Sequence, residues 1–180
     1  MAERPDVEEL TIEECSSENG VIIVATINRP EKLNALNIDV KEAIKSLCTW
    51  AQKTEEVLVV IFRGASPLPP PEGKRQKPHA FVAGADVSEF VGKDSTTIRP
   101  EFEDNVWEAV WKLRKPTIAL IDGYALGGGS ELALSCDIRI ATNRSMFGTP
   151  EINLGLIPGG GGTQRLTWLI GYGKAMEMVM

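Results

Sequence analysis

Hydrophobic positions along the chain follow two spacings, one typical of strands and one typical of helices. Residues 8–30, EELTIEECSSENGVIIVATINRP, place two apolar runs around the turn sequence Glu18-Asn19-Gly20, which predicts a β-hairpin. From Asn37, the predicted N-cap, apolar residues recur at helical spacing. They are Val40, Ala43, Ile44, Leu47, Cys48 and Ala51. A hairpin followed by an amphipathic helix is therefore expected.

Strand and helix patterns continue to alternate further along. Residues 57–62 (VLVVIF) and 117–121 (TIALI) are continuous apolar runs, typical of strands buried on both faces. Between them a second helix is predicted by Phe102, Val106, Ala109, Val110 and Leu113. The glycines at 127–129 open a third helix through Leu134, and residues 136–141 (CDIRIA) alternate like another strand. Repeated strand–helix units predict an α/β fold with crossover connections, in one domain over residues 1–180.

One segment fits neither pattern. Residues 66–80 (SPLPPPEGKRQKPHA) contain five prolines and four basic residues, counting the histidine. This composition predicts an exposed loop with polyproline character, and a mobile insertion is its simplest interpretation. Trp50, Trp107 and Trp111 lie on predicted helices and are interpreted as packing or interface residues.

Composition narrows the class of protein. With 180 residues, 43% hydrophobic and 24% charged, the chain has the balance of a globular domain. Its net charge of −6 argues against nucleic-acid binding, which relies on Lys and Arg. The three cysteines lack disulfide or zinc spacing, and neither a targeting segment nor an apolar run of about 18 residues is present. We therefore expect a cytoplasmic protein without membrane or nucleic-acid partners.

The segment GYALGGGSELALSCDI (123–138) carries the first candidate chemistry. A helix N-terminus has unpaired N–H groups and about half a positive charge, and glycines let an oxygen atom approach closely. The amide of Gly128 is placed to donate to such an oxygen, and Glu131 falls in the first helical turn. Taken alone, the glycine run is better interpreted as a tight turn.

Two further segments add candidate groups. In FVAGADVSEF (81–90), Asp86 is a predicted helix cap and Ala83 is a candidate second backbone donor; with Gly128 it would form an oxyanion hole. In FGTPEINLGLIPGGGGTQRL (147–166), Glu151 stands among apolar residues, so we expect partial burial and a raised pKa suited to proton transfer. A tight turn and a capping or surface glutamate remain the alternatives for each segment by itself.

Other catalytic classes lack their motifs. The glycine clusters do not have P-loop or dinucleotide-binding spacing. His79 is the only histidine, which argues against a histidine-dependent triad or a multi-histidine metal site. Catalysis would have to rest on carboxylates and backbone amides.

Four segments together resemble the enoyl-CoA hydratase/isomerase (crotonase) superfamily. They are INRPEKLNAL (27–36), FVAGADVSEF (81–90), PTIALIDGYALGGGSELALSCDIRIA (116–141) and FGTPEINLGLIPGGGGTQRL (147–166), in the family's order. The resemblance implies a spiral of ββα units, a coenzyme A thioester substrate, and an oxyanion hole at Ala83 and Gly128. It also matches both acids of the hydratases, at Glu131 and Glu151, which favours reversible hydration.

The resemblance also implies a set of substrate contacts. Lys32 and Leu33 would lie near the pantetheine and nucleotide end, Ala85, Asp86 and Val87 near the adenine, and Gly127 with the substrate-binding residues. No separate cofactor or metal is expected, and family members suggest a trimer or a pair of trimers. Family members also continue into further helices beyond a sequence like residues 171–180.

Three questions stay open on the sequence alone. The loop cations Lys74, Arg75 and Lys77 are hypothesised to reach the coenzyme A phosphates, because the acidic chain needs a local basic contribution. Double-bond isomerisation on the same fold is an alternative reaction. A non-catalytic CoA-binding or assembly module is the alternative of a different class.

Overall fold

The N-terminal part of the structure forms the predicted hairpin and helix. This computed structural model describes residues 3–98 and 104–180. Strands β1 (Leu10–Ser17) and β2 (Gly20–Ile27) pair antiparallel, and the 3-10 helix η1 (Pro30–Lys32) leads into helix α1 (Ile38–Lys53). The side chain of Asn37 accepts a hydrogen bond from the Val40 amide at 3.0 Å, which confirms the predicted cap.

From β3 onward the chain repeats a unit of two strands followed by helix. The first unit contains β3 (Val57–Gly64), β4 (Ala80–Val82), η2 (Val87–Phe90), α2 (Ser95–Ile98) and α4 (Val106–Lys112). The second contains β5 (Thr117–Ile121), β6 (Tyr124–Leu126) and α5 (Gly128–Ser135). The third contains β7 (Ile138–Ala141), β8 (Met146–Gly148), η3 (Pro150–Leu154) and α6 (Gly162–Ile170), and α7 (Tyr172–Val179) follows it.

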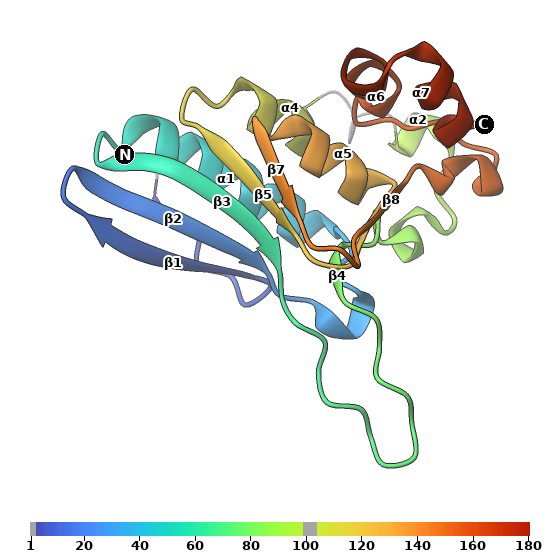
Figure 1. Cartoon of the computed structure of the whole chain (residues 1–180), viewed down its shortest axis with the longest axis horizontal. Coiled ribbons are helices and arrows are strands. Elements are labelled where there is room, and N and C mark those ends of the chain that lie inside the picture. Colours follow the sequence, from blue (N-terminus) through green and yellow to red (C-terminus); the bar gives the residue numbers. More distant parts are fainter. Residues whose placement is uncertain (1–2, 99–103) are drawn as a thin grey trace.

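The two strands of each unit belong to different sheets. The first strand joins a five-stranded sheet of order β1-β2-β3-β5-β7, and the second joins a three-stranded sheet of order β4-β6-β8. Apart from the hairpin, all neighbouring strands are parallel, with Val60 opposite Thr117 and Ile118 opposite Ile138. Each unit therefore advances both sheets by one strand, which is the predicted spiral of ββα units (Figure 1).

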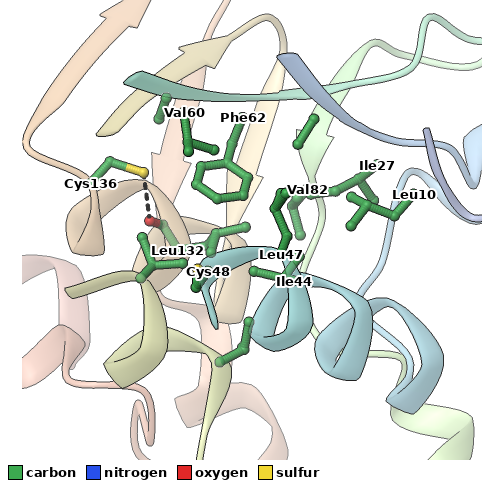
Figure 2. Packing of buried hydrophobic residues seen from close by; sticks show 14 of the residues in the cluster. Leu10, Ile27, Ile44, Leu47, Cys48, Val60, Phe62, Val82, Leu132 and Cys136 are labelled. Atoms are coloured by element: carbon green, nitrogen blue, oxygen red, sulfur yellow. Dashed lines mark hydrogen bonds between the residues drawn. The ribbon is translucent and has the colours of Figure 1, made fainter. Parts of the chain in front are cut away.

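The hydrophobic core lies between the larger sheet and the helices. Figure 2 shows Phe62 of β3 directed toward the helices that carry Leu47 and Leu132. All three side chains are fully buried, and burial of each contributes about 1.5–3 kcal/mol. The six apolar residues predicted to face the core from α1 are all buried, which confirms that helical pattern.

Two sequence predictions need correction. Helices α1, α4 and α5 pack on the same face of the larger sheet (Figure 1), and on its other face Leu58, Ile138 and Ile140 are 38–55% exposed. The prediction that residues 57–62 are buried on both faces was therefore wrong, whereas β5 alternates between buried and partly buried residues. A β-branched run indicates strand propensity, and it does not show whether both faces of the strand are covered. The second helix begins at Val106 and ends at Lys112; Phe102 lies outside the described residues.

The proline-rich segment is a loop, as predicted. Residues 65–79 contain no helix or strand, and residues 68–78 are all exposed. Figure 1 shows this loop projecting from the body of the molecule between β3 and β4. The ammonium group of Lys77 donates to the Glu31 carbonyl at 2.7 Å, which holds the returning limb of the loop near η1.

Within residues 3–98 and 104–180, no helix is both long enough and apolar enough to cross a membrane.

Candidate active site

A glycine turn places the start of α5 at the centre of the site. Gly127 has φ +50° and ψ −126°, a conformation that glycine adopts far more readily than other residues, and Gly128 is the first residue of α5. A Cβ on Gly129 would stand only 2.0 Å from the Val82 carbonyl oxygen, so this glycine lets α5 approach β4 closely. All of α5 is buried, and its first amides provide the unpaired donors expected from the sequence.

The amide of Ala83 does not serve as the predicted oxyanion donor. It donates to the carbonyl of Leu33 at 3.1 Å. The carbonyl of Gly84 accepts from Leu36 at 2.9 Å, and within a trans peptide the C=O and N–H point in opposite directions. The N–H of Ala85, in that same peptide, therefore points away from Leu36.

On that other side lies Gly128. A Cβ built on Gly128 would stand 3.5 Å from the amide nitrogen of Ala85. The structure thus brings together Ala85 and Gly128, in place of Ala83 and Gly128. The physical reason is Gly84, whose φ of +119° reverses the direction of the backbone amides between the two alanines.

Glu131 is held by a second glycine turn. Its side chain is 2% exposed, and Oε1 accepts hydrogen bonds from the amides of Gly160 at 2.7 Å and Gly162 at 2.9 Å. Burial, helped by the neighbouring charge of Glu151 and opposed by the two amide hydrogen bonds, raises the pKa of Glu131 to about 7. At neutral pH this carboxyl can both give and take a proton.

Glu151 approaches the first glycine turn, at Gly127, from η3. A Cβ on Gly127 would stand 2.9 Å from Oε1 of Glu151. Its Oε2 is buried and has no hydrogen-bond partner in the described part of the chain, and burial raises the pKa of Glu151. The predicted direction of the pKa shift is confirmed.

The predicted partial burial of Glu151 is confirmed as the cause of that shift. The apolar residues that follow Glu151 in the sequence are largely exposed themselves. They are Ile152, Leu154, Leu156 and Ile157, which are 46–76% exposed. The Gly127 turn, distant in sequence, lies against the carboxyl instead.

Trp107 is a contributor that sequence reasoning missed. Its side chain is buried, in agreement with the predicted packing role. Its Nε1 also donates a hydrogen bond to the carbonyl of Gly128 at 2.8 Å. A Cβ on Gly160 would stand 2.3 Å from its ring. Trp107 therefore contacts both glycine turns, and no spacing in the sequence connects α4 to either of them.

The predicted coenzyme A contacts gather at one end of the site. The amide of Ala83 donates a hydrogen bond to the Leu33 carbonyl, and Leu36 pairs with Ala85 in a parallel β-bridge. Residues 32–36 therefore run beside residues 83–86. Lys32 and Val87 are exposed at this end. The side chain of Asp86 accepts from the Ser88 amide at 3.2 Å, which confirms the predicted cap of η2. The roles of these residues toward a ligand stay predictions.

Comparison with known proteins agrees with this geometry. Residues 17–180 match the model of the family described as enoyl-CoA hydratase/isomerase. The chain belongs to this family. A short-chain-enoyl-CoA hydratase from Clostridium acetobutylicum is 43% identical over 164 residues, and a crotonyl-CoA hydratase from Syntrophomonas wolfei is 39% identical over 161 residues.

The matches cover most of this chain but a smaller share of its family relatives. The two alignments cover 89% and 88% of this chain, and 58% and 57% of the respective relatives. The crystal structure of an enoyl-CoA hydratase from Bacillus anthracis matches with a TM-score of 0.80 at 33% identity, covering 96% of this chain and 62% of that one. The chain therefore spans somewhat more than half the length of these members of the family.

No group of three or more His, Cys, Asp or Glu side chains that could hold a metal ion occurs among the described residues.

Proposed function

We propose that this chain carries the reaction centre of an enoyl-CoA hydratase, which adds water reversibly across the double bond of a 2-enoyl-CoA. The observation that carries the proposal is the proximity of two carboxyls, those of Glu131 and Glu151, beside the start of α5. Glu151 lies against Gly127, and Glu131 is close enough for the charge of Glu151 to raise its pKa. Two acids beside two backbone donors suit a reaction that moves a proton at each end of a double bond.

The backbone donors would bind the thioester oxygen. When the oxygen of water bonds to Cβ, the electron pair of the double bond shifts toward the carbonyl, and the thioester oxygen gains negative charge. The amides of Ala85 and Gly128 are fixed by the Leu36 pairing and by the start of α5, so they stabilise this charge without rearranging. Each such donor is typically worth about 10²–10³ in rate.

The carboxyl pair would supply the proton steps. One carboxylate accepts a proton from water as the O–Cβ bond forms, and a protonated carboxyl donates to Cα as the enolate collapses. The raised pKa values of Glu131 and Glu151 permit one protonated and one ionised form near neutral pH. The reverse sequence removes water from a 3-hydroxyacyl thioester.

The substrate class rests on the family and on the position of the predicted coenzyme A contacts. Relatives at about 40% identity are a short-chain-enoyl-CoA hydratase and a crotonyl-CoA hydratase. We therefore propose short enoyl thioesters such as crotonyl-CoA as substrates. The nucleotide would lie at the end where Lys32, Leu33, Asp86 and Val87 gather.

The decisive experiment measures hydration of crotonyl-CoA by the decrease in enoyl-thioester absorbance. We expect Glu131→Gln and Glu151→Gln each to reduce kcat by about 10²–10⁴-fold, since each removes a general acid–base group. The matched control is Glu177→Gln, an exposed glutamate on α7 paired with Lys174, which should leave kcat unchanged. Wild-type turnover in both site variants would overturn the proposal.

Two other outcomes would identify the alternatives. Conversion of a 3-enoyl-CoA to its 2-enoyl isomer without any hydroxyacyl product would indicate an isomerase. Binding of crotonyl-CoA without turnover of either substrate would indicate a CoA-binding module.

A further inference from the structure

A buried arginine stands behind the glycine turn that holds Glu131. Arg165 of α6 is 6% exposed, and its Nη1 donates to the Gly160 carbonyl at 2.5 Å. The backbone amide of Arg165 also donates to the Gly161 carbonyl at 2.9 Å. Both the side chain and the main chain of one residue therefore bind this turn.

The peptide groups of Gly160 connect Arg165 to Glu131. The carbonyl of Gly160 accepts from the guanidinium, while its N–H donates to Oε1 of Glu131 at 2.7 Å. A Cβ on Gly161 would stand 2.1 Å from Nη1 of Arg165, so the guanidinium fills the inside of the turn. A displacement of the guanidinium would therefore move the two amides that orient the carboxyl.

The guanidinium is itself fixed from the opposite side. Its central carbon lies 4.7 Å from the ring centroid of Trp111 on α4, and Trp168 is tilted against Trp111 with 6.4 Å between ring centroids. This stacking suits the planar guanidinium and does not suit the ammonium of a lysine. The Nε of Arg165 is buried with no hydrogen-bond partner in the described residues, a cost that a purely structural stacking contact does not require.

The charge of Arg165 acts on the same carboxyl. The charged groups that face Arg165 and Glu131 come from three elements: Glu108 on α4, Glu131 itself on α5, and Glu151 on η3. Burial and the charge of Glu151 favour the protonated form of Glu131, whereas the charge of Arg165 favours the carboxylate. Arg165 is thus positioned to limit how far the pKa of Glu131 rises.

We propose that Arg165 is a positioning residue for the reaction. It fixes the turn at residues 160–162 so that two amides orient the carboxyl of Glu131, and it stabilises the ionised form of that carboxyl. The inference rests on the proposed role of Glu131 in proton transfer. It assigns no contact between Arg165 and the substrate.

The test compares Arg165→Gln and Arg165→Lys with Arg139→Gln. Arg139 of β7 is the matched control, because it also donates to a backbone carbonyl, that of Cys136 at 2.7 Å. We expect Arg165→Gln to lower kcat by about 10²-fold with little change in KM, because a misplaced catalytic group costs about this much. Its pH–rate profile should shift to higher pH, while Arg139→Gln keeps the wild-type kcat and profile.

The lysine variant separates charge from geometry. Arg165→Lys keeps the positive charge but loses the planar fork and the stacking on Trp111. We expect it to return the pH–rate profile toward that of the wild type while kcat stays reduced. If Arg165→Gln fails to fold, Arg165→Lys and Trp111→Leu, the latter at a half-exposed position, still test the orientation through kcat.

A direct titration keeps this inference separate from the proposed function. The Glu131 carboxyl is followed by ¹³C NMR without substrate, with Glu131→Gln to assign its signal. We expect its pKa to rise by about one unit in Arg165→Gln and to stay unchanged in Arg139→Gln. An inactive wild type that shows this rise would overturn the proposed hydratase but not the Arg165–Glu131 coupling. A folded Arg165→Gln with the wild-type pKa and kcat would overturn the inference.

Discussion

Oε1 of Glu151 lies against Gly127, where a side chain would stand 2.9 Å from it. Gly127→Ala would displace this carboxyl and would strain a backbone at φ +50° and ψ −126°. We predict a fall in kcat of about 10²-fold or more, because the carboxyl would leave its place beside the amide of Gly128. Steady-state kinetics with crotonyl-CoA measures the effect.

Gly171→Ala is the control for backbone strain. Gly171 has φ +81° and ψ 160°, and apart from its two neighbours in the chain no residue comes within 4 Å of a Cβ built there. This variant should lose stability, as strained backbone costs about 1–3 kcal/mol, and keep the kcat of its folded fraction. An equal loss of kcat in both variants would show that strain, and not the Glu151 contact, explains the effect.

The raised pKa of Glu131 predicts how stability depends on pH. The folded chain holds this proton up to a pKa of about 7, whereas an unfolded glutamate releases it near 4.5. Between these values the folded state binds more protons, so the free energy of unfolding falls as pH rises. The difference of about 2.5 units corresponds to roughly 3 kcal/mol, present at low pH and lost as pH passes about 7.

Glu131→Gln isolates this contribution. Urea unfolding of both proteins at about pH 5 and about pH 8 gives the wild-type stability relative to the variant at each pH. We predict that this relative stability is lower at the higher pH by roughly 2.5 kcal/mol, since most of the titration of Glu131 falls between these two pH values. A relative stability that is the same at both pH values would mean that Glu131 titrates normally.

The sequence predicted the elements whose pattern is local. The hairpin, α1 with its Asn37 cap, and the start of α5 after Gly127 all follow from spacing and capping within a few residues. Strands β4, β6 and β8 are only three residues long. Such short strands carry too few positions for a recognisable alternation, so the residue pattern did not indicate the smaller sheet, and only the family resemblance implied a second strand in each unit.

The site shows the same division between local and long-range information. The sequence indicated that Glu131 and Gly128 share the first turn of a helix. Which alanine donates to the site depends on the turn at Gly84 and on pairing with Leu36, nearly fifty positions away. The side chains of Trp107 and Arg165 donate hydrogen bonds to carbonyl groups of the glycine turns. No sequence motif relates either residue to the carboxyls of the site, and so neither role was predicted.

A buried arginine with two carboxylate partners joins the segment that contains Ala85 to the segments that precede α1. Arg29 is 8% exposed, and its guanidinium binds Glu9 at 3.1 Å, Asp86 at 2.9 Å and the carbonyl of Ala35 at 2.7 Å. We predict that Arg29→Met lowers the free energy of unfolding by about 3 kcal/mol or more, because two carboxylates lose their partner. Urea unfolding measures this loss.

Lys174→Met provides the comparison on the surface. Lys174 pairs with Glu177 at 2.7 Å on α7, and both side chains are about 70% exposed. Removing an exposed pair should leave stability unchanged, because solvent screens it. If Arg29→Met is as stable as Lys174→Met, the Arg29 contacts do not hold the segment that contains Ala85.

The projecting loop yields the most specific prediction about the substrate. Lys74, Arg75 and Lys77 are exposed, and Lys77 is tied to the carbonyl of Glu31, next to Lys32. If these cations contact the coenzyme A phosphates, replacing all three by Ala raises KM for crotonyl-CoA by about 3-fold to 100-fold, since each exposed pair contributes about 0.2–1 kcal/mol. The KM for crotonyl-pantetheine, which lacks the nucleotide, should not change.

A second triple variant is the control for net charge. It has Lys53, Lys112 and Lys174 replaced by Ala, which removes the same charge from exposed positions elsewhere. It separates local contact from net charge, and an equal KM for crotonyl-CoA in the two triple variants would rule the loop out of phosphate binding.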